Sequence, residues 1–364
     1  MQRSTWRDEL RIIWAIAAKD IIDAIRNRMT LSIMLGVAVL VLSSMAFPLL
    51  ARLQGAPVAV IYDPGRSALI RALMTRDEFR LRIVDSQEEM EATVGGASEL
   101  ALGLVISEGF KEAAGTGGSV EMAGYVPHWA DPDQVAAQVA FFEDVLSEAS
   151  WQTVSIDVAG HIAYPSLDDM GYPHMVVTSL IIAVMTVGLA MVPYLLLEEK
   201  ETHTFEALMV SPARYHQIVM GKALTGLFYC FTAGVVVLAL NAQWIVHWWL
   251  MAVAVGLGAG FAVMLGLLLG SLFDDVSSVT MWMALLLMLL QVPIFLVGLN
   301  TSTWPALLRM AFSWLPSVAL DKLAAAAMLG SLTGVNLGGS VALLLASTLL
   351  ITVVVVWRIR REGR

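Results

Sequence analysis

The residue types that usually carry catalysis or bind metals are few in this sequence and stand far apart. Six histidines are spread along the chain without the short spacing of a metal site, and the one cysteine, Cys230, cannot form an intrachain disulfide. The phosphate-binding pattern G-x-x-x-x-G-K-[ST] is absent, and neither a nucleophile elbow nor a pairing of cysteine with histidine is visible. We therefore expect no catalysis by the chain itself, no metal or cofactor of its own and no nucleic-acid partner.

One polar segment, residues 198–212, has the features of a docking site for another protein. Acidic residues come first, where the N-terminus of a helix is electropositive, and Pro212 ends the helix. Phe205, Leu208 and Met209 share one helix face, which suits a groove on a partner, although packing on the protein's own helices is the alternative. The residues that we expect to couple to a partner are Glu198, Glu199, Glu201, Thr204, Phe205, Glu206, Leu208, Met209, Ser211 and Pro212.

The composition indicates that most of the chain lies in a membrane. Hydrophobic residues make up 58% and charged residues 15%, and the mean hydropathy is +0.73, whereas soluble domains carry about 25% charged residues. A helix needs about 20 apolar residues to cross a bilayer, and lipid requires that its backbone groups bond internally. We expect a mainly α membrane protein with six transmembrane helices. Uncharged apolar runs occur at 31–50, 175–197, 223–246, 248–273, 276–299 and 338–357.

Residues 1–30 precede the first transmembrane helix and carry six basic side chains. This is too much polar sequence for a cleavable signal peptide. An apolar stripe predicts a helix that lies in the membrane interface, with Asp20 away from the stripe, and a cytoplasmic helix packed on protein is the alternative. The stripe contains Leu10, Ile13, Trp14, Ala17 and Ile21.

The basic residues predict the orientation of the chain. Outside residues 51–173 there are fifteen Lys and Arg, and thirteen of them fall on one side if both termini are cytoplasmic. This distribution follows the positive-inside rule. We therefore expect a multi-pass protein of the inner or plasma membrane, with a cytoplasmic tail at 359–364.

Residues 51–173, between the first and second transmembrane helices, are too long for a connector and should form an extracytoplasmic domain. Short apolar runs such as 58–62 and 100–106 alternate with helical patterns such as 132–150, which predicts an α/β domain. Nineteen acidic residues stand against seven basic ones, a net charge of −12, which favours a solvated surface and leaves attraction of cations open. No ligand-binding pattern is visible.

The remaining residues, 174–358, should form a five-helix transmembrane domain with a cytoplasmic coupling loop at 198–218. Residues 301–337 are apolar but broken by prolines, which favours two short helices that dip into the outer leaflet. Asp321 and Lys322 lie there and could pair with each other. Small residues at four-residue spacing allow helices to approach closely in lipid. We expect this role for Gly256, Gly258, Gly260, Gly266 and Gly270.

The coupling segment and the helix after it resemble the signature of type-2 ABC exporter permeases, E-[KR]-E-x-x-T-[LFM]-E-x-L-[LM]-x-[ST]-P followed by Gly-Lys. His203 stands where that family usually has Gly, and the order of elements resembles the family along nearly the whole chain. The matching residues are Glu199, Glu201, Thr204, Glu206, Leu208, Ser211, Pro212, Gly221 and Lys222.

The resemblance implies a homodimeric permease that works with a separate ABC ATP-binding subunit, which binds the ATP. The six apolar runs lack Asp, Glu, Lys and Arg, which argues against a carrier that is driven by ion coupling. The same apolar character favours an amphipathic or hydrophobic cargo. A sodium-extruding exporter permease is the alternative within the family. A membrane sensor with an extracytoplasmic ligand-binding domain, or a scaffold that recruits a soluble partner through 198–212, is the alternative from another class.

Overall fold

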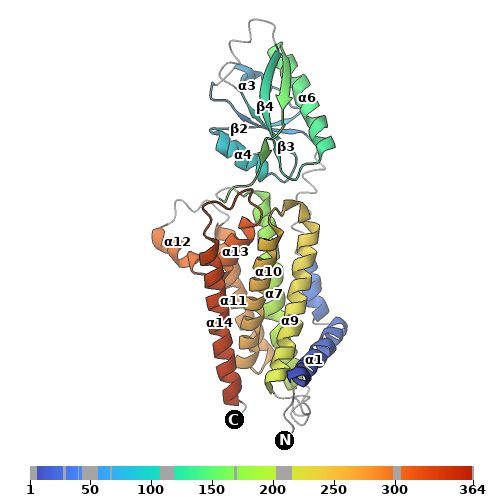
Figure 1. Cartoon of the computed structure of the whole chain (residues 1–364), viewed down its shortest axis with the longest axis vertical. Coiled ribbons are helices and arrows are strands. Elements are labelled where there is room, and N and C mark those ends of the chain that lie inside the picture. The colour runs from blue at the N-terminus through green and yellow to red at the C-terminus, as the bar shows by residue number, and fades with distance from the viewer. Residues whose placement is uncertain are drawn as a thin grey trace.

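The computed structural model describes residues 6–27, 30–39, 41–42, 56–65, 68–106, 119–167, 170–201, 215–297 and 305–362. It consists of a bundle of long helices with an α/β unit at one end (Figure 1). Helix α1 (Trp6–Arg26) and the last residues of helix α14 (Leu337–Glu362) lie at the other end of the bundle. The two ends of the described chain therefore lie on the same side.

Five helices in the described part of the chain are long and apolar enough to cross a membrane. Besides α14 they are α7 (Tyr172–Glu201), α9 (Tyr215–Leu240), α10 (Trp248–Leu272) and α11 (Val276–Val297). Of the first predicted transmembrane helix, Thr30–Val39 forms a shorter apolar helix, and residues 43–50 lie outside the described set. The chain is thus a mainly helical membrane protein, and its sixth transmembrane helix stays a prediction.

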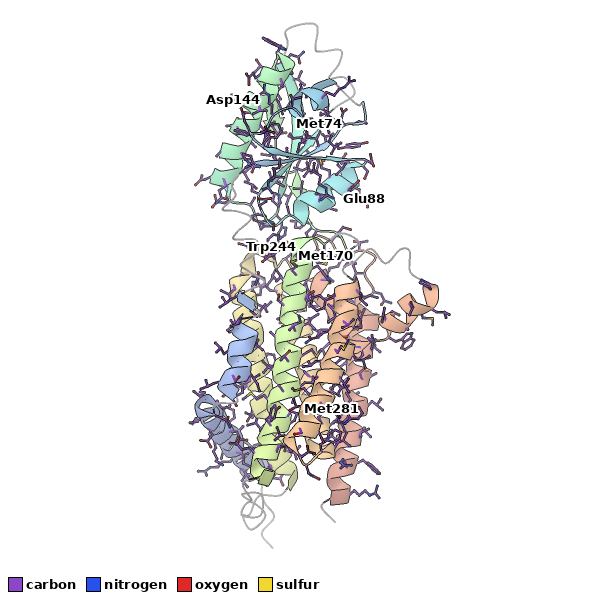
Figure 2. The ribbon with its side chains drawn as sticks, turned by 180° about the vertical axis from the view of Figure 1, so that it is seen from behind. Met74, Glu88, Asp144, Met170, Trp244 and Met281 are labelled. Carbon is purple, nitrogen blue, oxygen red and sulfur yellow. The ribbon has the colours of Figure 1, made fainter. Side chains whose placement is uncertain are left out.

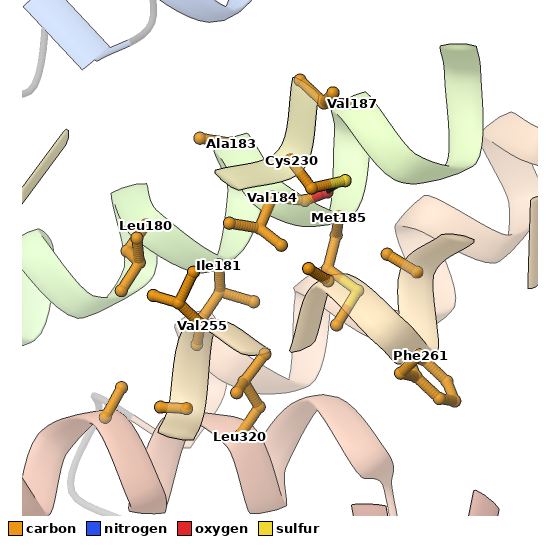
Figure 3. Close-up of a cluster of buried hydrophobic side chains, with 14 of the residues drawn as sticks. Leu180, Ile181, Ala183, Val184, Met185, Val187, Cys230, Val255, Phe261 and Leu320 are labelled. Atoms are coloured by element: carbon orange, nitrogen blue, oxygen red, sulfur yellow. Dashed lines mark hydrogen bonds between the residues drawn. The ribbon is translucent and has the colours of Figure 1, made fainter. Parts of the chain in front are cut away.

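Helix α7 forms the centre of the bundle. Its apolar stretch is 89% buried, against 22% for α11 and 11% for α14, whose apolar side chains face outward. In Figure 3 side chains of α7 such as Val184 and Met185 meet neighbours from α9, α10 and helix α13 (Pro316–Ala326), among them Cys230, Val255 and Leu320. Burial on all sides explains why α7 shows no amphipathic pattern, as expected of a helix enclosed by other helices.

Two short helices occupy the described part of the broken segment 301–337. Helix α12 (Ala306–Ser313) lies at the edge of the bundle (Figure 1). Helix α13 packs against α7, α10, α11 and α14 and is buried along its length. Pro316 stands at the first helical position, where its missing N–H costs no hydrogen bond. Whether the pair dips into the outer leaflet stays a prediction.

The α/β unit is a sheet with helices on both faces. Its strand order is β2-β1-β3-β4-β5, with β6 paired to β4, and β3 and β4 form the antiparallel pair. The strands are β1 (Val58–Tyr62), β2 (Arg80–Val84), β3 (Ala101–Val105), β4 (Ser119–Pro127), β5 (Thr153–Asp157) and β6 (Ile162–Ala163), and the helices are α3 (Ala68–Leu73), α4 (Gln87–Gly95) and α6 (Pro132–Ser150).

Alternation along β1 shows how the sheet buries both faces. Ala59 and Ile61 pack in one core with α3 and α6, and Val60 packs in a second core with α4. Because successive residues of a strand point to opposite faces, a strand covered on both sides must be apolar throughout. The uninterrupted apolar run 58–62 follows from this arrangement.

Candidate functional site

The proposed coupling segment follows the end of α7 that lies away from the α/β unit. Glu198, Glu199 and Glu201 occupy the last turn of α7, and α9 begins at Tyr215. The exposed Glu198 carboxylate accepts a hydrogen bond from the Asn27 side chain, with Nδ2 and Oε1 3.0 Å apart. The other predicted coupling residues lie outside the described residues: Thr204, Phe205, Glu206, Leu208, Met209, Ser211 and Pro212.

The length of α7 places its acidic end beyond the apolar stretch. Its 30 residues span about 45 Å, whereas the hydrocarbon core of a bilayer is about 30 Å thick. The charged last turn can therefore lie in water while the middle of the helix lies at the depth of the hydrocarbon core, enclosed by the other helices. The sequence ends the apolar run at residue 197 and predicts the acidic residues at the N-terminus of a new helix, which is wrong: the structure continues α7 through the charged turn to Glu201, so these residues stand at a helix C-terminus.

Helix α1 is joined to the first part of α9, at the end of the bundle away from the α/β unit. Lys222 Nζ lies 3.0 Å from Asp20 Oδ2, and the two side chains are only 2% and 7% exposed. The Thr225 hydroxyl donates a hydrogen bond to the Ala17 carbonyl at 3.3 Å, and the Tyr229 hydroxyl donates to the Ile21 carbonyl at 2.7 Å. Spacings of three and four residues place these three side chains of α9 on one face.

Asp20 lies away from the apolar stripe that the sequence predicts for the membrane interface, and the structure buries it in protein, which the stripe did not predict. Asp20 is buried against α9, whereas the stripe residues Leu10 and Trp14 are exposed, at 53% and 63%. The family signature identified Lys222 but not its partner. A charge on an amphipathic helix is usually solvated, so periodicity alone gave no sign of the ion pair.

A cavity of about 200 Å³ lies beside the same end of α7. Pockets for drug-sized molecules begin at roughly 300 Å³, so this cavity is large enough to hold a fragment of such a molecule and too small to enclose all of it. The Tyr194 hydroxyl at its wall shares a 2.7 Å hydrogen bond with Thr280 of α11. Apolar side chains line most of the wall, and Asn27, Thr30, Tyr194 and Glu198 supply its polar groups.

The predicted packing glycines divide into two groups. A Cβ added at Gly258 would meet Leu320 of α13 at 2.7 Å, and one at Gly266 would meet the Gly188 carbonyl of α7. Gly270 is similarly close to Leu196 of α7. At Gly256 and Gly260 an added Cβ would meet nothing within 4 Å. Three of the five glycines thus permit close packing within the chain, and two face open space.

At the other end of the bundle an aromatic cluster joins the α/β unit to the helices. The rings of His128 and Tyr164 stack with centroids 5.1 Å apart, and Trp129 and Tyr172 contact Trp244 at 4.9 and 5.2 Å. Figure 2 shows Trp244 at this boundary. Trp244 is 1% exposed, and burial lowers the pKa of His128 from its ordinary value of 6.5. The sequence analysis did not identify this cluster.

The backbone reinforces the same junction where α4 ends and α7 begins. The Tyr172 N–H donates a 2.8 Å hydrogen bond to the Gly96 carbonyl. Gly171 has a φ of +58°, a conformation that side chains disfavour, and a Cβ added there would collide with the Gly96 backbone. The start of the central helix is therefore bonded directly to the α/β unit.

Comparison with known families places this arrangement in one of them. Residues 28–357 match the model of a family described as ABC-2 family transporter protein. The matched range begins after α1 and contains the α/β unit, helices α7 to α11 with the segment between α7 and α9, and α14 up to residue 357. No curated protein matches the chain.

Proposed function

The chain belongs to the ABC-2 family of transporter proteins, and we propose that it is the permease subunit of an ATP-driven exporter. The sequence has no phosphate-binding loop, so the energy of ATP must come from a separate ATP-binding subunit. A second copy of the chain completes the permease. The observation that carries this proposal is the family match across the bundle and the coupling segment together.

The coupling step follows from the position of segment 198–212. Closure of the ATP-binding subunits pushes on this segment, which connects the central helix α7 to α9. Because α9 is bonded to α1 through Lys222, Thr225 and Tyr229, the push moves α1 and α9 together. The segment thus transmits the movement of the ATP-binding subunits to the central helix α7 and, through α9, to α1.

We propose an amphipathic or hydrophobic cargo. The cavity beside α7 supports this because its wall is mostly apolar with polar groups at Asn27, Tyr194 and Glu198, which suits a molecule with both characters. A hydrated ion would need a path lined by charges, carbonyls or water. The apolar runs of this chain contain no Asp, Glu, Lys or Arg.

The test is ATP hydrolysis by the complex of the chain with its ATP-binding subunit, reconstituted in liposomes. A panel of lipophilic amphipathic compounds is compared with sodium varied at constant ionic strength. We expect saturable stimulation by one or more amphipathic compounds and no response to sodium. Saturable stimulation by sodium alone, accompanied by sodium flux, would replace this cargo with a cation. Absence of any ATPase activity in the complex would contradict the exporter itself.

A further inference from the structure

A part-buried histidine and a buried carboxyl face each other where α7 and α13 pack together, at the end of the bundle next to the α/β unit: the side chain of His174 is 19% exposed and that of Asp321 is 5% exposed. Asp321 of α13 is 3% exposed, and its Oδ1 lies 3.8 Å from His174 Nδ1 of α7. The expected ion pair of Asp321 with Lys322 does not form among the described residues: Lys322 is exposed, although its positive charge still acts on Asp321. Adjacent residues of a helix do not face each other.

The surroundings of this pair are polar on both helices. Thr178 lies one turn after His174, with its hydroxyl 3.5 Å from His174 Nε2, and Ser317 lies one turn before Asp321. In the described part of the chain, Asp321 Oδ1 and the fully buried Ser317 hydroxyl have no hydrogen-bond partner. Four polar side chains thus gather at a helix contact that is otherwise apolar.

Burial without partners decides the charge state of the pair. An ionised carboxylate with no compensating group is far more costly to bury than a neutral one. The pair is neutral overall when it holds one proton, either on the carboxyl or on the imidazole. The separation of 3.8 Å is too long for a hydrogen bond, and an approach of about 1 Å would bring the two atoms to hydrogen-bond distance.

The other helices that pack on α13 supply few competing charges. Helix α11 contains no ionisable residue, and the charged residues of α14 begin at Arg358, at its far end. His247 precedes α10, and its Nε2 is buried with no hydrogen-bond partner among the described residues. Arg309 lies in α12, and its side chain is outside the described set. His174 is the base that the geometry places against Asp321.

We propose that His174 and Asp321 form a proton-binding site that holds one exchangeable proton between α7 and α13. Loss of this proton leaves a carboxylate buried among apolar side chains, which favours separation of the two helices and entry of water. A second proton leaves the imidazolium without a counter-ion. Both changes loosen the same contact, so the packing at this end of the bundle is tightest at intermediate pH. Ionisable residues buried within the helix bundle of a membrane protein commonly mark such proton sites.

The direct test is infrared spectroscopy of the purified full-length chain during a pH titration. We expect a carboxylic-acid C=O band that disappears on alkalinisation in the wild type and is missing in Asp321→Asn. His174→Gln should retain the band and shift the pH at which it disappears. The matched control is Asp144→Asn, an exposed carboxylate of α6 that should leave the band unchanged (Figure 2). Identical spectra for the wild type and Asp321→Asn throughout the titration would overturn the proposal.

A second measurement rests on the proposed exporter function. In proteoliposomes with the pH fixed on the ATP side, cargo-stimulated ATP hydrolysis should depend on the pH of the opposite side. His174→Gln and Asp321→Asn should reduce this dependence at least severalfold, and His247→Gln should keep it. If the wild type hydrolyses no ATP at any pH, the exporter function fails and the infrared result still decides the proton site. If Asp321→Asn keeps the wild-type infrared band, and both variants keep the wild-type dependence of ATP hydrolysis on pH, the proton site is refuted.

Discussion

Lys222 and Asp20 form an ion pair that protein shields from water on all sides. Their side chains are 2% and 7% exposed, and the two charged atoms are 3.0 Å apart. Removing both charges from water costs several kcal/mol, which their attraction only partly offsets. Such a pair adds little net stability as a whole, but either charge alone in the same place is strongly unfavourable.

Lys222→Met should therefore lower the free energy of unfolding by about 3–5 kcal/mol, because it leaves the Asp20 carboxylate buried without a partner. The double variant Asp20→Leu/Lys222→Met should recover most of this loss, since apolar side chains of similar size fill the space. Thermal unfolding in detergent measures both. Lys19→Met, at an exposed neighbouring position, is the matched control and should be neutral. A double variant no more stable than Lys222→Met would contradict this account.

The buried His128 imidazole at the junction should make the stability of the folded chain depend on pH. Burial lowers its pKa below 6.5, so the folded chain keeps it neutral while the unfolded chain takes up a proton. The stability present above pH 6.5 should be lost progressively as the pH falls toward the lowered pKa. His128→Gln should flatten the dependence of the unfolding temperature on pH below 6.5. A His128→Gln variant with the wild-type slope in that range would exclude His128 as its source.

For single residues, the sequence shows which side chains are important better than it shows which side chains they contact. The family signature marks Lys222, and the broken segment marks Asp321, but neither predicts the facing side chain. Asp20 and His174 lie in other helices, more than a hundred residues away from their partners in sequence. Such contacts depend on how helices rotate and pack, and hydrophobic periodicity does not report the rotation of a helix buried on all sides.

Helices α7 and α10 approach each other through small residues, and this predicts unequal effects of the same substitution. Gly266→Leu should destabilise the chain strongly, because the added side chain collides with the Gly188 backbone of α7. Gly260→Leu has open space within the single chain and should leave its unfolding temperature nearly unchanged. Thermal unfolding of the two variants in detergent compares them. Equal destabilisation would show that the α7–α10 contact does not depend on close approach at Gly266.

Substitutions at the open positions Gly256 and Gly260 also test whether these glycines lie at the contact between two copies of the chain. If either lies at the contact between two chains, leucine there should reduce the dimer fraction without unfolding the monomer. The molecular mass of the detergent complex, from light scattering, measures this. An unchanged mass for both variants would remove these two glycines from the contact between chains.

The coupling segment gives a prediction of its own. Glu201 lies in the last turn of α7, and Glu206 follows it in the segment that we propose to bind the ATP-binding subunit. Replacing both with Lys should leave expression and unfolding temperature unchanged and reduce co-purification of that subunit several-fold. Glu88→Lys/Glu91→Lys in α4 of the α/β unit is the charge-matched control. Normal co-purification with normal transport would contradict the docking role.

At the scale of elements, the sequence predicts most helices and strands near their observed places, and it fails where polar and apolar residues are balanced. Strand β5 is absent from the sequence-based prediction, although Val154 and Ile156 alternate with three exposed residues, which is the period of a half-buried strand. Helix α9 ends at Leu240, whereas the apolar run continues to residue 246. Asn241 and a short 3-10 helix at Ala242–Trp244 interrupt it, because Trp244 turns into the junction with the α/β unit.

The whole molecule has two distinct ends, and they imply an orientation. One end carries the α/β unit with its excess of acidic residues, and the other carries α1, the end of α14 and the loop between α10 and α11 (Figure 1). Lys and Arg gather at the second end, where Arg358 also donates a 2.7 Å hydrogen bond to the Ser271 carbonyl. From the positive-inside rule we expect that end to lie in the cytoplasm.

Accessibility of single cysteines tests this orientation in intact cells. Cys230 is buried and is first replaced by Ser, which can keep the weak hydrogen bond that its Sγ donates to the Val184 carbonyl at 3.5 Å. A membrane-impermeant thiol reagent should then label Ser155→Cys in β5 and Ser331→Cys after α13, because both positions are exposed at the α/β end. Ser277→Cys, exposed at the start of α11, and His203→Cys in the coupling segment should react only after the cells are permeabilised. Labelling of His203→Cys from outside would reverse the orientation and remove the coupling segment from the cytoplasm. The side on which α1 lies depends in addition on whether residues 31–50 cross the membrane.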